Sequence, residues 1–163
     1  MILDLIYILI VGAIVNMVPV FVRKWKFLAY PVDFGLKFRD KRIFGDNKTW
    51  KGLFWGLVFS VFLVYVLVDT FSWDVPYILG FFIAVGVLGG DLIKSFIKRQ
   101  LGYKPGERFI PFDQLDSAIG LGIVLLCYNF SFILVLELIL IWFFGHMIIR
   151  HLGYYLKITK EKW

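Results

Sequence analysis

The stretch "VGVLGGDLIKSFIKRQLGYKPGERFIPFDQLDSAIGLGIVLL", Val85 to Leu126, joins two apolar segments through a short polar loop. Acidic and basic side chains are closely spaced along it, and carboxylates stand at both ends, where the chain enters the apolar runs. These side chains include Asp91, Lys94, Lys98, Arg99, Lys104, Arg108, Asp113 and Asp116. A plain connection between two apolar segments does not require carboxylates at its two ends. The pattern therefore indicates a polar site where two apolar helices end.

The rest of the chain is strongly apolar as well. Of the 163 residues, 60% are hydrophobic and 20% aromatic, and the mean hydropathy is +0.80. A soluble domain of this size could not bury so much apolar surface. We therefore expect an all-α integral membrane protein that forms a single transmembrane catalytic domain, residues 1–163. The single Cys127 excludes an intramolecular disulfide and belongs to no metal-binding motif.

Five apolar segments are candidates for membrane-spanning helices, given a hydrocarbon core of roughly 30 Å. They predict spans at about 2–22, 50–68, 77–97, 113–128 and 132–150, with longer polar loops at 23–49 and 98–112. The Gly and Pro residues of the second loop predict that the chain turns back there instead of continuing either helix.

The basic residues predict how these spans are oriented. All 18 Lys and Arg residues lie in Arg23–Lys51, in Lys94–Arg108 or in the tail from Arg150, and the turns 68–76 and 129–131 contain none. Loops that remain in the cytoplasm carry an excess of Lys and Arg. We therefore expect an N-terminus outside, a C-terminus inside, and a multi-pass protein of the cell membrane whose two cytoplasmic loops form the active site.

The polar residues at the end of the third span follow a helical spacing. Asp91, Ser95 and Lys98 are at positions i, i+4 and i+7, which places them on one face. Lys94 is expected on the flank of that face, and Arg99 is expected to point elsewhere. This face is the first half of the predicted site.

Asp113 and Asp116, three residues apart, supply the second half at the start of the fourth span. From Asp116 to Tyr128 a helix covers only roughly 20 Å, so Asp116 is expected below the headgroup level, where a charge usually marks a functional site. Three carboxylates with Asp91 would repel one another unless a divalent cation joined them, and hard oxygen ligands suit Mg²⁺. The alternative is an interfacial network of salt bridges with the neighbouring bases Lys94, Lys98, Arg99 and Arg108.

The first loop contains a second polar motif, "RIFGDNKTWKGLFWG", Arg42 to Gly56. Asp46 or Asn47 is expected to cap the second span, with Lys48 and Thr49 in its first turn. A helix N-terminus with free N–H groups and nearby lysines can bind phosphate. The alternative is an ordinary helix cap followed by tryptophans at the membrane interface.

The two motifs together resemble those of the CTP-dependent lipid cytidylyltransferases. The run "DLIKSFIKR", a lysine five residues later, and "PFDQLDS" match the signature of the phosphatidate cytidylyltransferases at Ser95, Lys98, Arg99, Lys104, Pro111, Asp113 and Asp116. The chain departs from it at Pro105, at Gln114 and in lacking a His-Gly-Gly insert. These departures, the five-span size and "GDNKTWKG" from Gly45 to Gly52 resemble the smaller archaeal branch, the CDP-archaeol synthases.

This resemblance implies a reaction. CTP and 2,3-bis-O-geranylgeranylglycerol 1-phosphate would give CDP-archaeol and pyrophosphate with Mg²⁺ as cofactor; membrane lipids and these substrates are the expected partners, and no nucleic acid is. The resemblance implies that Asp91, Asp113 and Asp116 bind the metal ion and that the same three residues and Lys98 are catalytic. The residues expected to bind the nucleotide and its phosphates are Asn47, Lys48, Thr49, Ser95, Lys98, Arg99 and Lys104.

Several alternatives share parts of this pattern. A phosphatidate cytidylyltransferase would use a diacyl lipid, and a CTP-dependent polyprenol kinase would release CDP where a cytidylyltransferase releases pyrophosphate. A CDP-alcohol phosphotransferase needs a D-G-x2-A-R motif, which "DQLDSAIG" lacks. A cation carrier, the non-enzyme alternative, would distribute its acids through the membrane depth, whereas these cluster at one face.

Overall fold

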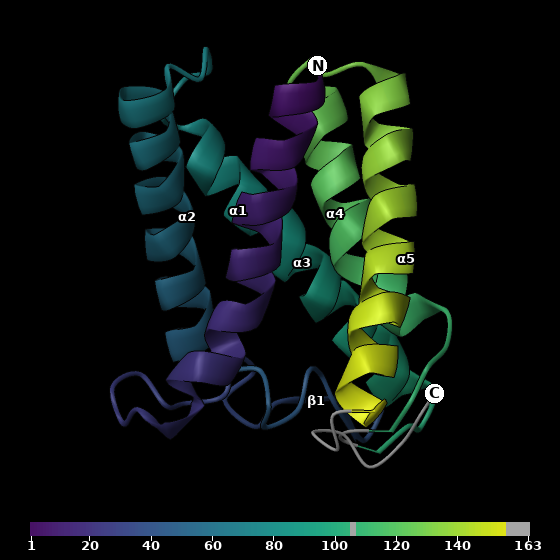
Figure 1. Ribbon diagram of the computed structural model, residues 1–163. Helices are drawn as coiled ribbons and strands as arrows, with labels where there is room; N and C mark the ends of the chain where they lie inside the picture. The colour runs from purple at the N-terminus through teal and green to yellow at the C-terminus, as the bar shows by residue number, and fades with distance from the viewer. Residues whose placement is uncertain (105–106, 156–163) are drawn as a thin grey trace.

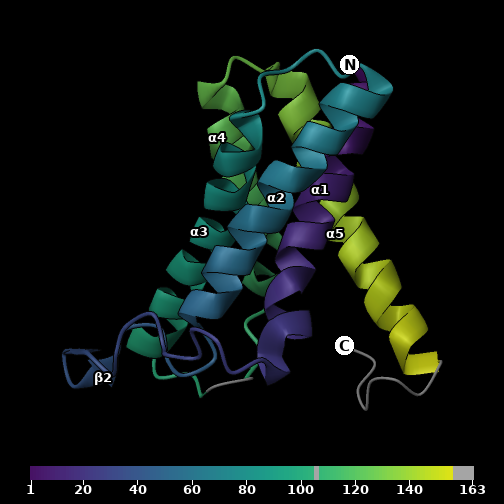
Figure 2. The same cartoon turned by 90° about the vertical axis from the view of Figure 1, so that its left-hand side faces the viewer.

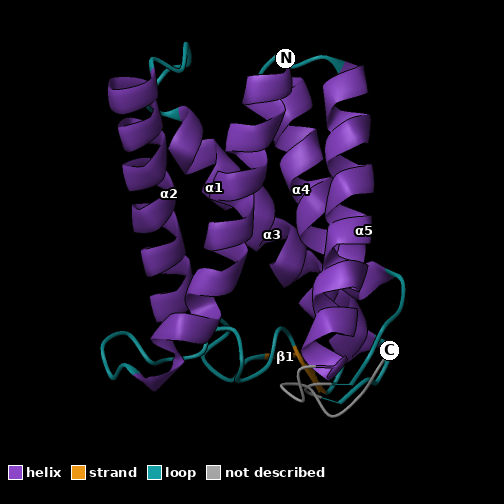
Figure 3. Cartoon of the chain, in the orientation of Figure 1, coloured by secondary structure: helices purple, strands orange, loops and turns teal. Residues whose placement is uncertain are grey.

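The computed structural model describes residues 1–104 and 107–155 as one bundle of helices (Figure 1). A two-stranded hairpin lies in the first loop, and nearly all other regular structure in the described residues is helical (Figure 3). The helices are α1 (Ile2–Phe21), α2 (Trp50–Phe71), α3 (Leu79–Gln100), α4 (Phe112–Cys127) and α5 (Phe132–Tyr155), with a 3₁₀ turn η1 (Val22–Lys24) and strands β1 (Lys37–Phe38) and β2 (Lys41–Arg42). The predicted all-α class is confirmed.

The helix bounds differ from the predicted spans by a few residues. The third helix starts two residues later and ends three residues later than expected, at Leu79 and Gln100. Within the described residues, three segments are long and apolar enough to cross a membrane: Ile2–Lys24, Trp50–Phe71 and Leu79–Gln100. The fourth helix has only 16 residues. Near the start of this short helix, the Asp116 side chain is 7% exposed and the Asp113 side chain 22%.

The connections between helices gather at two opposite ends of the bundle. The N-terminus lies with the short connections α2–α3 and α4–α5 at one end, and the first loop lies with the α3–α4 loop at the other (Figures 1 and 2). The two basic loops therefore share one end of the molecule. The tail 156–163, which holds three of the predicted cytoplasmic lysines, is outside the described residues.

The core follows from the helical spacing of the apolar residues. Ile8, Val11 and Val15 of α1 have no exposed surface, and they belong to the same core cluster as Val87 of α3 and Leu121 of α4. Many large apolar side chains on the outer faces, such as those of the opposite side of α1, are exposed. An apolar exterior around an apolar core is what a membrane-embedded bundle requires.

The packing of α3 against α4 depends on glycine. A Cβ added at Gly90 would collide with the backbone carbonyl of Asp116, and one added at Gly120 would collide with the backbone of Gly86. Small residues let two membrane helices approach until their backbones touch. This close approach brings the polar end of α3 directly against the acidic start of α4.

The start of α2 differs from the prediction. The helix begins at Trp50, so Lys48 and Thr49 precede it, and no side chain caps it. Lys48 and Trp50 are instead paired with the start of the loop: Val32 N–H donates to the Lys48 carbonyl (2.8 Å) and Trp50 N–H to the Tyr30 carbonyl (3.0 Å). The expectation of a cap with Lys48 and Thr49 in the first turn is wrong, because this backbone pairing holds both residues extended.

The proposed cap residues themselves lie in the turn before this pairing. Asp46 is exposed and bonds Arg42 at 2.8 Å. Asn47 is exposed as well. Neither side chain bonds the N-terminus of α2, which carries no side-chain cap. The turn nevertheless presents Asn47 and Lys48 towards α3, as the cavity described below shows.

Candidate active site

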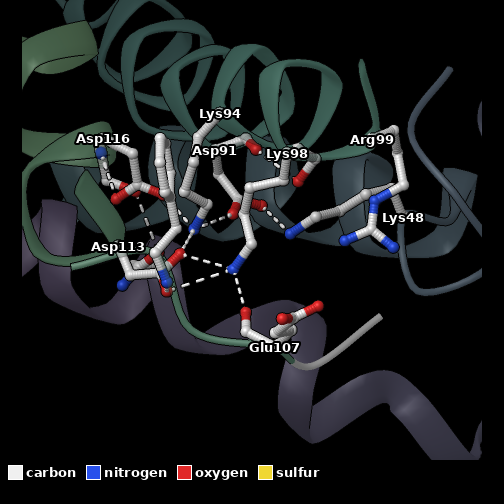
Figure 4. Close-up of polar contacts among 12 residues, drawn as sticks. Lys48, Asp91, Lys94, Lys98, Arg99, Glu107, Asp113 and Asp116 are labelled. Carbon is white, nitrogen blue, oxygen red and sulfur yellow. Dashed lines mark hydrogen bonds and ion pairs between the residues drawn. The ribbon is translucent and has the colours of Figure 1, made fainter. Parts of the chain in front are cut away.

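Three carboxylates converge on one lysine at the junction of α3 and α4 (Figure 4). The Nζ of Lys94 lies 2.5 Å from Asp116 Oδ2, 3.3 Å from Asp91 Oδ1 and 3.5 Å from Asp113 Oδ1. The Lys94 side chain is only 17% exposed. The structure thus brings together the three acids that the sequence singles out, and it places Lys94 at their centre instead of on the flank.

Two further lysines complete the network. Lys48 of the first loop bonds Asp91 Oδ2 at 2.5 Å, and Lys98 bonds both oxygens of Asp113 at 3.0 and 3.2 Å. Of the salt bridges anticipated as the alternative, those of Lys94 and Lys98 are present, and Lys48 of the first loop adds a partner that was not expected. Three acids and three lysines balance in charge, which is how a protein can keep such groups partly buried.

Lys98 also connects the network to the loop that leads into α4. Its ammonium donates to the Glu107 backbone carbonyl as well as to Asp113. Asp113 in turn accepts a hydrogen bond from the Phe109 N–H at 2.7 Å. The loop before α4 is therefore fastened to α3 by one lysine and one aspartate.

A polar cavity of about 120 Å³ lies beside this network, between the first loop and α3. Four of its lining side chains are cationic, from Lys48, Lys94, Lys98 and Arg99. The complete lining is Phe44, Gly45, Asp46, Asn47, Lys48, Lys94, Ser95, Lys98 and Arg99. A partly enclosed space lined by four cationic side chains and by Asn47 is suited to a polyanion such as a nucleoside triphosphate.

The nucleotide-binding set predicted from the sequence is only partly assembled here. Asn47, Lys48, Ser95, Lys98 and Arg99 line the cavity, whereas Thr49 and Lys104 do not. Thr49 pairs through its backbone with Pro31. Lys104 is exposed, and its backbone carbonyl accepts a hydrogen bond from Arg99 at 3.0 Å.

Arg99 and Ser95 take positions that spacing alone did not predict. Arg99 was expected to point away from the Asp91 face, but it lines the same cavity, and its buried Nε has no hydrogen-bond partner among the described residues. The Ser95 hydroxyl donates to the Asp91 carbonyl at 2.8 Å. Arg99 therefore keeps an unused donor, and the proton of Ser95 is engaged within α3.

Sequence reasoning missed Asp33, which lies behind the cavity wall in the first loop. Burial by itself would raise the pKa of Asp33, but hydrogen bonds from Arg42 and from the N–H groups of Gly45, Phe44 and Gly35 bring that pKa well below its usual range. The same contact with Asp33, helped by Asp46, raises the pKa of Arg42. No motif marks Asp33, because its partners become neighbours only when the loop is folded.

An apolar groove of about 260 Å³ runs between α3 and α4 on the other side of Lys94. Ile93, Ile97, Phe109, Phe112, Ile119 and Ile123 form most of its wall, and Lys94 and Asp116 lie in it as well. Lys94 therefore lines both the groove and the polar cavity. A larger groove of about 430 Å³ between α2 and α3 has no charged residue in its wall.

The carboxylates suit a hard divalent cation in ligand type, and all three contact the Lys94 ammonium. In the described part of the chain, however, no three His, Cys, Asp or Glu side chains stand at metal-binding distances from one another. The Lys94 ammonium fills the centre that they share. Any cation bound there would have to replace it.

Known proteins with similar sequences are numerous. A family model described as CarS-like CDP-archaeol synthase matches residues 1–163. The CDP-archaeol synthase of Methanoregula boonei is 36% identical over 147 residues, which cover 82% of this chain and 89% of the relative. The CDP-archaeol synthase of Sulfolobus acidocaldarius is 34% identical over 141 residues, 82% of this chain and 83% of the relative.

A solved structure has the same fold. It is described as an intramembrane enzyme for archaeal membrane lipids biosynthesis, and it superposes with a TM-score of 0.78 at 27% sequence identity. The match covers 90% of this chain and 92% of the other. Sequence and structure comparisons therefore agree over nearly the whole length.

Proposed function

This chain belongs to the CDP-archaeol synthase family, and from that premise we propose that it transfers the CMP group of CTP to the phosphate of 2,3-bis-O-geranylgeranylglycerol 1-phosphate. The products are CDP-archaeol and pyrophosphate, and the enzyme is a CTP-dependent lipid cytidylyltransferase of archaeal membrane lipid synthesis. The observation that carries the proposal is the family match over residues 1–163, in a chain whose cationic cavity adjoins three carboxylates.

The polar cavity is the proposed site for the triphosphate of CTP. Lys48 reaches it from the first loop, and Lys98 and Arg99 line it from the end of α3 (Figure 4). The Arg99 guanidinium lines the cavity, and its N–H groups are donors of the kind that bind phosphate oxygens. The site thus neutralises charge from three directions.

The chemistry requires little from the protein beyond positioning and charge. An oxygen of the lipid phosphate attacks the α-phosphorus of CTP, the new P–O bond forms, and the bond to the β-phosphate oxygen breaks, so that pyrophosphate leaves with its electron pair. The attacking phosphate is ionised near neutral pH, and no general base is needed. This explains a site made of lysine, arginine and aspartate.

The groove between α3 and α4 is the proposed entry for the lipid acceptor. Its apolar wall suits an isoprenoid chain, and its charged end at Lys94 adjoins the nucleotide cavity. The larger groove between α2 and α3 offers no such charged end. The acceptor phosphate can therefore reach Lys94 while its chains remain at the lipid-facing surface.

Asp91, Asp113 and Asp116 are the proposed ligands of Mg²⁺. The support is the convergence of their oxygens on one cationic point. When bound, the ion would neutralise charge on the triphosphate. Release of Lys94 from the three acids would free its ammonium for a phosphate of either substrate, because it lines both spaces.

The active site is proposed to face the cytoplasm of a cell-membrane protein. Both basic loops lie at the same end of the bundle as the cavity (Figure 2). The positive-inside rule then orients that end inwards. CTP is a cytoplasmic metabolite, which fits this orientation.

Product analysis with purified protein tests the function. The protein is incubated with Mg²⁺, each of the four nucleoside triphosphates, and either the isoprenoid or a diacyl glycerol phosphate. The proposal is supported if CDP-archaeol and pyrophosphate form with CTP and no product forms with the other three nucleoside triphosphates. Release of CDP would indicate a kinase, and preference for the diacyl lipid would indicate a phosphatidate cytidylyltransferase.

A further inference from the structure

We propose that Asp33 is a positioning residue that holds the first-loop wall of the nucleotide cavity in place and thereby controls the binding of CTP. It touches neither substrate. The inference rests on the proposed function, since it assigns the cavity to CTP. The residues involved are one buried carboxylate and the backbone N–H groups that donate hydrogen bonds to it.

The Asp33 side chain has no exposed surface and accepts five hydrogen bonds. Arg42 donates two, from Nη2 at 2.7 Å and from Nε at 3.3 Å. The backbone N–H groups of Phe44, Gly45 and Gly35 donate the others, at 2.9, 3.0 and 3.1 Å. One carboxylate therefore joins the two sides of the hairpin in the first loop.

The backbone held by Asp33 is part of the cavity wall. Phe44 and Gly45 both line the cavity, and the Gly45 carbonyl accepts a hydrogen bond from the Lys48 N–H at 3.2 Å. Lys48 then reaches across to Asp91 of α3. Since Gly45 has a φ of +91°, its neighbours depend on fixed contacts to hold this turn. A shift of Gly45 would displace this part of the cavity wall and, with it, the Lys48 ammonium.

Only an ionised carboxylate fits this role. Its two oxygens can accept all five bonds, whereas an asparagine has one acceptor oxygen and an NH₂ group that would face other donors. Asp46 cannot substitute for Asp33, because it is 77% exposed and bonds the Arg42 side chain without accepting from Phe44 or Gly45. Removal of the Asp33 charge should therefore loosen this wall specifically.

The test compares Asp33→Asn with Asp40→Asn, the same change at an exposed position in the hairpin turn. In Asp33→Asn we expect the KM for CTP to rise at least about tenfold, as for the loss of charge-assisted hydrogen bonds. The KM for the lipid acceptor should stay within about twofold, because the acceptor groove is on the other side of Lys94. Asp40→Asn should match the wild type in both.

Amide hydrogen exchange of residues 43–48 gives a readout that does not depend on catalysis. Exchange in this segment should accelerate in Asp33→Asn, while that of α3 and α4 stays unchanged. A purely structural role would instead shift both KM values and kcat together. That result, or unchanged exchange at residues 43–48, would overturn the proposal.

Two further measurements distinguish an error in the role of Asp33 from an error in the proposed function. If the wild type makes no CDP-archaeol, the function fails, and the exchange measurement still decides whether Asp33 holds the wall. If Asp33→Asn does not fold, Arg42→Lys takes its place: it keeps a cation near Asp33 but loses the paired geometry. It should give a smaller rise in the KM for CTP, and an unchanged KM would overturn the proposal.

Discussion

Lys48 Nζ lies 2.5 Å from Asp91 Oδ2, although 43 residues separate the two in the sequence. This pair joins the first loop to α3, and Lys48 also lines the polar cavity. Because Asp91 also contacts Lys94, the pair links the loop to the carboxylate cluster. The loop, the nucleotide cavity and the acidic cluster are therefore one connected unit.

Replacement of Lys48 by methionine should weaken CTP binding. The cavity loses one of four cationic side chains, and Asp91 loses one of the two ion pairs that it makes with described residues. A hydrogen bond to a charged group contributes about 1.5–3 kcal/mol, so the KM for CTP should rise roughly ten- to a hundredfold. Steady-state kinetics measure this, with Lys37→Met in the exposed hairpin as control. An unchanged KM would remove Lys48 from the nucleotide site.

Asp113→Asn should abolish most product formation while the protein still folds. Asparagine has the same shape and can still accept the hydrogen bond from the Phe109 N–H, but it loses the charge that faces Lys94 and Lys98. Loss of one group that positions charge in an active site lowers kcat about 10²- to 10³-fold. We expect the melting temperature to stay within a few degrees and Mn²⁺ binding in the presence of CTP to fall.

The control for this change is Asp69→Asn at the exposed far end of α2. It should leave product formation and metal binding at wild-type levels. Substantial turnover of Asp113→Asn at saturating Mg²⁺ would exclude Asp113 from the metal site. Loss of turnover with Mn²⁺ binding intact would assign it to the positioning of Lys98 alone.

Much of this arrangement can be read from the sequence, and the exceptions have a common cause. Long apolar runs locate all five helices, because burial in a membrane leaves little choice of structure. Asp91, Asp113 and Asp116 are found because the sequence places these carboxylates where apolar helices end, and charges next to membrane spans usually mark a functional site. Lys94 was placed on a flank, since helical spacing describes one helix at a time. Only the approach of α4 along the glycines of α3 makes Lys94 central.

The first loop was the least predictable part for a related reason. Its start pairs with residues 48–50 through backbone hydrogen bonds that leave no residue pattern. The sequence pattern therefore places Lys48 and Thr49 in the first turn of α2, whereas the helix begins at Trp50. Asp33 looks like any loop aspartate until the chain returns at Phe44 and Gly45.

A bulky residue in the groove between α3 and α4 should interfere with the lipid acceptor alone. Ile123 lines this groove and is exposed, so Ile123→Trp can fill it without disturbing the core. We expect the KM for the lipid to rise at least about tenfold, as for lost burial of several methylene groups, with an unchanged KM for CTP. Ile133→Trp, on the exposed face of α5, serves as control. Equal effects of the two changes would contradict entry through this groove.

Gly90→Ala should destabilise the protein and separate the halves of the site. The new methyl group would meet the Asp116 backbone carbonyl, which cannot move away without shifting α4. Overpacking of this kind costs about 1–3 kcal/mol. We expect a lower melting temperature and reduced turnover. Gly89→Ala adds the same methyl group where nothing lies within 4 Å and should be neutral; destabilisation by both would point to a general requirement for glycine.

The pairing of Asp33 with Arg42 should make part of the stability depend on acid pH. Since the pKa of Asp33 is lowered in the folded state, the unfolded chain binds its proton more readily, starting near the ordinary aspartate value of about 3.9. The stabilisation is therefore complete above that value and is lost as the pH falls towards the lower folded-state pKa. Arg42→Gln removes the guanidinium, so the difference in melting temperature from the wild type should be largest near neutral pH and should shrink below about pH 4. Thermal unfolding in detergent between pH 3 and 7 measures this difference in melting temperature. A difference that grew as the pH fell would have the opposite sign, and it would refute the claim that an ionised Asp33 stabilises the first loop.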